Sequence, residues 1–260
     1  AMPPARRPAV PAGVRIVDDT QHIDINNLSM PVTNTGSFTW DRTTGNAGLE
    51  YPKGSGKKVV FASGLWLGAR VTATPRVTTS GYFDEFQPGA VSAGVADDPA
   101  KPEYKVYRLE RSYASTAARD AALADYVAGA VSHGAQGVPV LAGGTLDIPG
   151  DQMCWSVYND LDAAQHISQP GSTAPLGVEV QQTTFAFNRA GALGSTVFTR
   201  FRIFNRGTQP LLEAYAGMWA DPDIGGFSDD LAGCDPSLGL GYCYNATNTD
   251  VAYGATPPAV

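Results

Sequence analysis

Apolar and polar residues alternate over two long neighbouring stretches of the chain, residues 176–189 and 195–208. An apolar residue at every second position is the pattern of a β-strand that buries one face. The segment AGALG, at 190–194, has residues typical of a hairpin connection. The pattern therefore predicts a long antiparallel hairpin with one buried face. In the first strand Val178, Val180, Gln182, Thr184 and Ala186 fall on one side, and Glu179, Gln181, Thr183, Phe185 and Phe187 on the other. In the second strand Val197, Thr199, Phe201, Ile203 and Asn205 fall on one side, and Phe198, Arg200, Arg202 and Phe204 on the other.

Shorter stretches rich in β-branched and aromatic residues predict further strands at 14–32, 59–73, 79–87, 103–110, 154–160 and 211–221. Gly68 and Ala69, near the end of 59–73, favour a β-bulge or a tight backbone approach. Residues 33–58 are rich in turn formers, and their large side chains are expected to anchor this loop to a sheet. Those side chains are Phe38, Trp40, Leu49 and Tyr51.

Only the stretch 115–134 has a helical pattern. Ser115 or Thr116 is placed to cap its start, and Gly134 is placed to end it. Its apolar face is predicted to carry Ala118, Ala122, Val127 and Val131.

Many strands, frequent turns and one helix predict an all-β fold. We expect an antiparallel β-sandwich of the jelly-roll or Ig-like kind, with long hairpins and one inserted α-helix near 115–133; a closed barrel is the alternative. Residues 1–20 begin with a segment rich in proline and alanine and are predicted to form an extended N-terminal arm. Residues 21–260 are predicted to form a single domain with an insertion at about 90–147.

The net charge of the chain limits the classes of partner that it is expected to bind. Its formal net charge is −7 and its pI is about 4.9, whereas a protein that binds nucleic acid needs a basic surface. Nucleic acid is therefore not an expected partner. No apolar run approaches the roughly 20 residues that cross a bilayer, so no membrane span is predicted.

No catalytic residue can be selected from the sequence. The three histidines, His22, His133 and His166, lack an accompanying G-x-S-x-G serine and are expected to be solvated or to cap a helix. Carboxylates are plentiful, but their spacing selects no acid and base pair. Tryptophans that reach the surface would stack on sugar rings, and the candidates are Trp66, Trp155 and Trp219.

Clustered aspartates make calcium the best-supported ligand in the sequence. Asp221, Asp223, Asp229 and Asp230 lie in one glycine-rich loop, and hard cations prefer such oxygen ligands. The run from Asp221 departs from an EF-hand, because Ala232 stands where that motif has glutamate. Asp160, Asp162 and Asp235 are further candidates for a non-helical site. The alternative is a set of turns in which each aspartate bonds its own backbone.

The cysteines and two sequons bear on the environment of the protein. Cys234 and Cys243 flank a short loop and are expected to form a disulfide, whereas Cys154 is expected to be a buried strand thiol. Asn27 and Asn245 each begin an N-x-S/T sequon and are candidate glycosylation sites.

Three long motifs resemble a family of large secreted bacterial surface proteins, many of which carry a C-terminal sorting domain for type IX secretion. They are INNLSMPVTNTGSFTWDRTTGNAGLEYPKGSGKKVVFASGLWLGA, WSVYNDLDAAQH with the hairpin that follows it, and MWADPDIGGFSDDLAGCDPSLGLGYCYNATNTD. The resemblance covers most of residues 23–260. It implies export, a β-rich extracellular fold and a bacterial source, but no known active site. Similar proteins are expected to continue beyond Val260, so a fragment or a processed chain is expected.

Two functions are expected from these observations. The first is a non-enzymatic extracellular structural protein that assembles with copies of itself into a filament or layer at the cell surface, by adding its N-terminal arm to a neighbour's sheet. The second is a calcium-stabilised carbohydrate-binding module of a larger surface protein, and a glycoside hydrolase is a further alternative.

Overall fold

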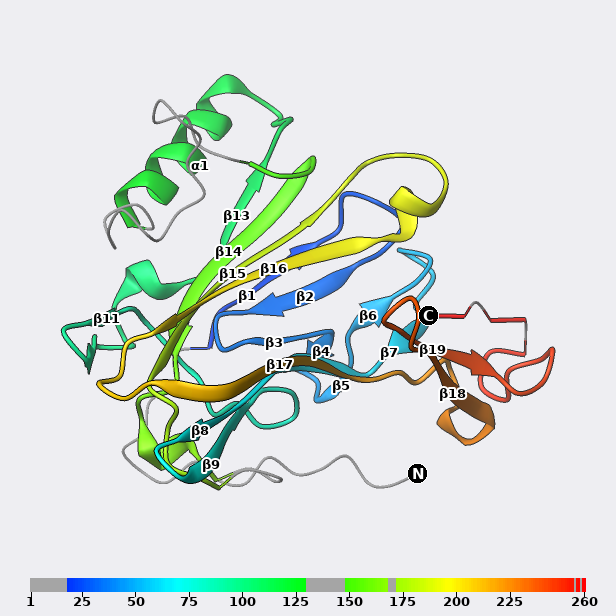
Figure 1. The fold of residues 1–260 in the computed structure, drawn as a ribbon. Coiled ribbons are helices and arrows are strands. Elements are labelled where there is room, and N and C mark those ends of the chain that lie inside the picture. Colours follow the sequence, from blue (N-terminus) through cyan, green and yellow to red (C-terminus); the bar gives the residue numbers. More distant parts are fainter. Residues whose placement is uncertain (1–17, 130–147, 168–171, 255, 258) are drawn as a thin grey trace.

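The structure is a computed structural model of the chain and describes residues 18–129, 148–167, 172–254, 256–257 and 259–260 (Figure 1). Two large antiparallel sheets form most of it. Sheet I has the order β1 (Thr20–Ile23), β2 (Met30–Thr33), β3 (Ser37–Phe38), β8 (Ala62–Val71) and β17 (Leu211–Asp221), and β9 (Thr74–Thr79) also pairs with β8. Sheet II has the order β10 (Gln87–Pro88), β14 (Gln152–Asn159), β15 (Val178–Ala186) and β16 (Val197–Asn205), and β13 (Tyr107–Glu110) also pairs with β14.

The described chain also forms four small two-stranded sheets, which are separate from the two large ones. They are β4 (Trp40–Asp41) with β5 (Asn46–Ala47), β6 (Leu49–Glu50) with β7 (Lys58–Val60), β11 (Val91–Ser92) with β12 (Val95–Ala96), and β18 (Asp230–Asp235) with β19 (Leu240–Asn245). Short 3₁₀ turns cover Pro102–Tyr104, Ala163–Gln165, Ala192–Ser195 and Phe227–Asp229.

The main core lies between sheets I and II. Alternate residues of β8, among them Leu65 and Leu67, pack against Tyr158, Val178 and Val180 of sheet II. A second part of the core joins β1, β2 and β3 to the other ends of β14 and β15. The predicted all-β sandwich with one inserted helix is therefore confirmed, and each large sheet keeps free edges rather than closing into one barrel.

The helix α1 (Thr116–Gly129) packs beside sheet II on the face away from sheet I (Figure 1). Tyr126, which is fully buried, packs edge-to-face against Tyr107 and Trp155. The predicted cap is present, because the Ser115 hydroxyl accepts a hydrogen bond from the Ala118 amide. The predicted apolar face is wrong at Ala118 and Val127, which are exposed, and Val131 and Gly134 lie outside the described residues.

Several predicted strands differ in extent. β17 has the predicted bounds, but 79–87 is mostly an irregular loop between β9 and β10, and 103–110 forms a strand only from Tyr107. The irregularity expected at Gly68 and Ala69 of β8 lies in its partner strand, where the register shifts between Leu212 and Tyr215. The arm predicted at 1–20 falls mainly outside the described residues, although Asp19 and Thr20 are held by hydrogen bonds to the body.

Candidate functional site

The strands β16 and β17 form two free edges at the same side of the sandwich. Within the described parts of the chain, β16 pairs with β15 alone and β17 with β8 alone. Only residues 206–210 connect them, so the chain passes directly from the edge of sheet II to the edge of sheet I (Figure 1). A free edge presents unpaired backbone groups to any extended segment that approaches it.

Core-facing side chains of both edge strands reach solvent. Ile203 of β16 lies opposite Val180, and Met218 of β17 lies opposite Leu65, so each shares a face with a buried partner. Val180 and Leu65 are 0% and 2% exposed, whereas Ile203 and Met218 are 39% and 63% exposed. We call these two free edges, with the core-facing side chains Phe201, Ile203, Ala216 and Met218, the open seam.

The backbone of β17 is also available at this edge. The Asp221 carbonyl accepts a hydrogen bond from the Phe61 amide, next to β8, and the Leu65 carbonyl accepts one from Ser80 on the far side of β8. Because backbone groups alternate in direction along a strand, the odd-numbered residues of β17 here point to β8. The even-numbered residues Ala216, Met218 and Ala220 therefore direct their N–H and C=O groups to the free edge.

The protection usual for an edge strand is confined to the first part of β17. Glu213 has a φ of 49° and lies at the register shift, so the strand bulges there. The seven residues after Glu213, at 214–220, contain no charged side chain. Natural edges are commonly blocked by charges, proline or bulges, and this part of β17 has none of them.

Aromatic side chains gather on the opposite face of sheet I. The rings of Trp66 and Trp219 are stacked with centroids 5.9 Å apart and an interplanar angle of 7°. Two adjoining hollows of about 200 and 230 Å³ share Trp66 and Thr79 in their linings. Of the tryptophans expected at a sugar-binding surface, Trp155 is buried at 1% exposure in the core under α1, so only Trp66 and Trp219 remain.

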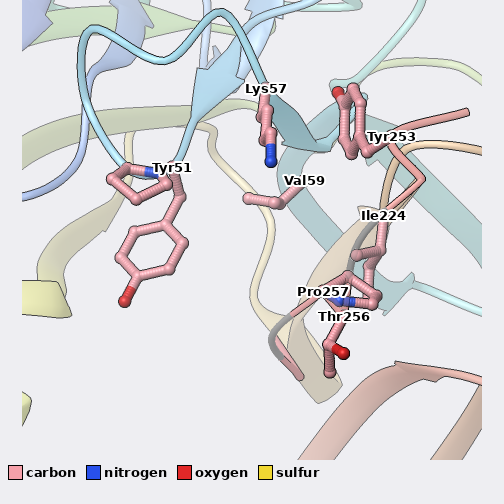
Figure 2. Close-up of a pocket in the computed structure, with 8 residues that line it drawn as sticks. Tyr51, Lys57, Val59, Ile224, Tyr253, Thr256 and Pro257 are labelled. Atoms are coloured by element: carbon pink, nitrogen blue, oxygen red, sulfur yellow. The ribbon is translucent and has the colours of Figure 1, made fainter. Parts of the chain in front are cut away.

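A third feature is a pocket of about 320 Å³ between the β6–β7 loop and the C-terminal segment (Figure 2). Tyr51 and Tyr253 stand at its sides, and the buried Val59 and Ile224 form its apolar floor. The ammonium of Lys57 lies 5.7 Å from the centroid of the Tyr253 ring and points into the space between the two tyrosines (Figure 2). A single cation between apolar walls suits an apolar ligand that carries one carboxylate.

Three of the four aspartates predicted to bind calcium already accept hydrogen bonds from the protein. Asp221 accepts one from the Tyr82 hydroxyl, Asp230 from the Ile224 amide and Asp229 from the Val251 amide. Burial, with Asp221 and Asp230 nearby, raises the pKa of Asp223 to about 6. Among the residues that the structure describes, no three acidic, histidine or cysteine side chains are grouped to hold a metal ion, so the calcium site stays a prediction.

The further calcium candidates have distinct structural roles. Asp160 is fully buried and accepts hydrogen bonds from Thr78 and from three consecutive backbone amides, at 176–178. Asp162 caps the 3₁₀ turn at Ala163–Gln165. Asp235 accepts bonds from the amide and hydroxyl of Ser237, which is the local turn expected as the alternative to a metal site.

The expected disulfide finds no support in the structure. Cys234 lies opposite Gly241 and Cys243 opposite Ala232 in the β18–β19 hairpin, and both are free thiols, as is the buried Cys154. The sequon residues differ in access, because Asn27 is exposed while Asn245 is half-buried and donates to the Thr247 carbonyl. Glycosylation at either position stays a prediction.

His166 is not solvated, but it caps a turn, which was the alternative expected for the histidines. It is 6% exposed, it is the C-terminal cap residue of the 3₁₀ turn Ala163–Gln165, and its Nε2 lies 2.9 Å from the Asp160 carbonyl oxygen. His22 is exposed, and partial burial of its ring lowers its pKa. His133 lies outside the described residues.

Sequence reasoning missed the open seam, because an alternating pattern does not tell a central strand from an edge strand.

No protein-family model matches the chain, and no curated protein or solved structure matches it either. In the described part of the chain, no helix is both long and apolar enough to cross a membrane.

Proposed function

We propose that the chain is a non-enzymatic extracellular structural subunit that assembles with copies of itself. In this proposal the N-terminal segment of one copy adds as a strand to the open seam of the next, and repetition builds a filament or layer. The observation that carries the proposal is the exposure of core-facing side chains beside the uncharged free edge of β17.

The N-terminal segment has a length and a pattern that suit this role. Residues 1–17 would span at most about 56 Å when extended, whereas the 11 residues of β17 span about 36 Å. Within the segment, apolar residues recur at every second position, at Val10, Ala12, Val14 and Ile16. A strand with this period would place all four on one face, toward the core.

Pro11 does not oppose this pairing. A strand added at the free edge of β17 would bond it through alternate residues only, and Val10, Ala12 and Val14 all keep their amide hydrogens. The backbone of Pro11 would then point away from β17, where a missing N–H costs nothing.

Charge favours the same partner. Residues 1–17 contain Arg6, Arg7 and Arg15 and none of the 25 acidic residues, so their side chains carry +3 and those of the remainder −10. An antiparallel register that sets Val10 opposite Ala220 and Val14 opposite Ala216 also brings Arg7 to the level of Asp223. Opposite charges at that end of β17 would favour this register over its neighbours.

Deletion of residues 1–17 tests the proposal, because it leaves Asp18, Asp19 and β1 in place. We expect the full chain to form large assemblies by sedimentation velocity and electron microscopy, and the deleted chain to sediment as a monomer. A deletion of residues 1–9, which keeps the alternating part, is the matched control and should still assemble. Equal assembly by the full chain and the chain lacking 1–17 would refute the proposal.

A further inference from the structure

The outer face of sheet I carries flat aromatic side chains held in fixed positions. The Trp66 indole donates a hydrogen bond to the Ser80 carbonyl, 3.0 Å away. Trp219 packs against it on one side and meets the ring of Tyr82 edge-to-face, with centroids 5.4 Å apart. Tyr82 is fixed in turn by its hydrogen bond to Asp221. The aromatic surface is therefore preorganised rather than assembled when a ligand arrives.

Glycines beside these rings keep the face flat. In register, Gly217 lies opposite Trp66, and Gly68 lies opposite Tyr215, which is 76% exposed. A Cβ on Gly217 would meet no atom within 4 Å, so nothing in the described chain requires glycine there. Glycine inside a strand weakens it, and close approach of a ligand is one of the reasons for which glycine is found there.

The two hollows that adjoin at Trp66 have walls suited to a sugar. Both are shallow and largely apolar. A pyranose ring presents a flat face of C–H groups that stacks on an aromatic ring, while its hydroxyls point outward. Arg70 lies on the same face of β8, two residues beyond Gly68, and pairs with Glu213 at 3.1 Å. Both side chains are exposed enough to form hydrogen bonds with the sugar hydroxyls.

We propose that the face formed by Trp66, Tyr215, Gly217 and Trp219 is a binding site for a neutral oligosaccharide, with successive sugar rings in the two hollows. The site is separate from the open seam, because these residues lie on the opposite side of sheet I from Leu65 and Met218. Strand addition at the edge would leave this face uncovered.

The test measures tryptophan fluorescence of the full chain during titration with cello-, malto-, xylo- and chito-oligosaccharides. Binding of at least one of these is expected to shift the emission, because the sugar replaces water at Trp66 and Trp219. Gly217→Leu places a bulky side chain in the hollow that Gly217 lines, and it is expected to weaken that binding by about tenfold or more. Gly241→Leu is the matched control, since Gly241 also lies in a strand with no atom within 4 Å of its Cβ position, and it should bind like the wild type.

Three results would overturn the inference. One is no fluorescence shift with any of the four oligosaccharide classes. Another is binding that Gly217→Leu leaves unchanged. The third is loss of self-assembly in Gly217→Leu without any sugar binding by the wild type, which would make the face a contact between copies. Met218→Lys, which alters the seam, should retain sugar binding, so failure of the two proposals can be told apart.

Discussion

Ile203 and Met218 belong to different sheets, yet both lie on the core-facing side of an edge strand and both reach solvent. Their register partners, Val180 and Leu65, are almost completely buried. Exposed apolar surface of this kind costs free energy, since roughly 25 cal/mol is gained for each Å² that is covered. Covering these side chains with one more strand is therefore favoured by the hydrophobic effect.

A charge at the seam should block assembly without unfolding the subunit. Met218→Lys places an ammonium where the added strand would pack, so we expect the assembled fraction to fall to that of the chain lacking 1–17. Because Met218 is 63% exposed, the free energy of unfolding should change by no more than about 0.5 kcal/mol. Val95→Lys, at a 69% exposed position in β12, is the control and should assemble normally. Normal assembly by Met218→Lys would contradict the assignment of the seam.

Asp160 should be essential for stability, whereas the nearby Asp162 should not. Asp160→Asn places an NH₂ group among four donors in a fully buried site, so we expect a loss of about 3 kcal/mol or more in urea unfolding. Asp162→Asn should change the free energy of unfolding little, because asparagine caps a turn as well as aspartate does. Equal effects of the two substitutions would show that the buried carboxylate is not the anchor described above.

Asp223 should make the protein less stable as the pH rises. Its folded-state pKa, raised to about 6 by burial and by Asp221 and Asp230, lies above the ordinary aspartate value of 3.8. The folded state therefore binds the extra proton between about pH 4 and 6, and its stabilisation is lost as the pH rises through that window.

Asp223→Asn removes this effect. Because the carboxyl is partly exposed to solvent, we expect a gain of at most about 1 kcal/mol at pH 8, or about 2 to 4 °C in melting temperature. At pH 4 the gain should vanish. An equal gain at both pH values would show that charge repulsion is not its cause.

One thiol of the three should react quickly. Cys234 is exposed, Cys243 is buried and has a raised pKa because of its burial, and burial raises the pKa of Cys154 to about 12. A maleimide should therefore label one cysteine per native chain rapidly and all three after denaturation. No rapid labelling, restored by a reductant, would instead support the Cys234–Cys243 disulfide.

Local pattern was enough to predict several elements. β17 has the bounds that its apolar and aromatic residues indicated, and Ser115 caps α1 as its position before an alanine-rich run implied. Both features depend on residues adjacent in sequence. The alternating hairpin was also found, as β15 and β16, because its period of two is a property of each strand alone.

The position of each strand in its sheet could not be predicted in this way. The alternating pattern predicted one buried face, yet Glu179 and Gln181, on the other side of β15 from the core residues Val178 and Val180, are buried as well. They are covered because Glu179 accepts from the Val91 amide, pairs with Arg206 and accepts from Gln181, and two of these three partners are distant in the sequence. β16 has a similar alternating pattern but lies at the edge and stays largely exposed.

The roles of the aspartates could not be predicted from the local sequence either. A cluster in the sequence predicted shared ligation, but Asp229 bonds Val251 and Asp160 bonds the start of β15, so distant segments decide what each carboxylate does.

The most direct test of strand addition is a cross-link between copies. A photoreactive phenylalanine analogue at position 218 is introduced into ¹⁵N-labelled chain, which is mixed with unlabelled chain, allowed to assemble and irradiated. The proposal predicts mixed-isotope cross-links from position 218 of one copy to residues 10–17 of another, identified by mass spectrometry. Cross-links from position 218 to other segments alone, or only within one isotopic chain, would contradict it.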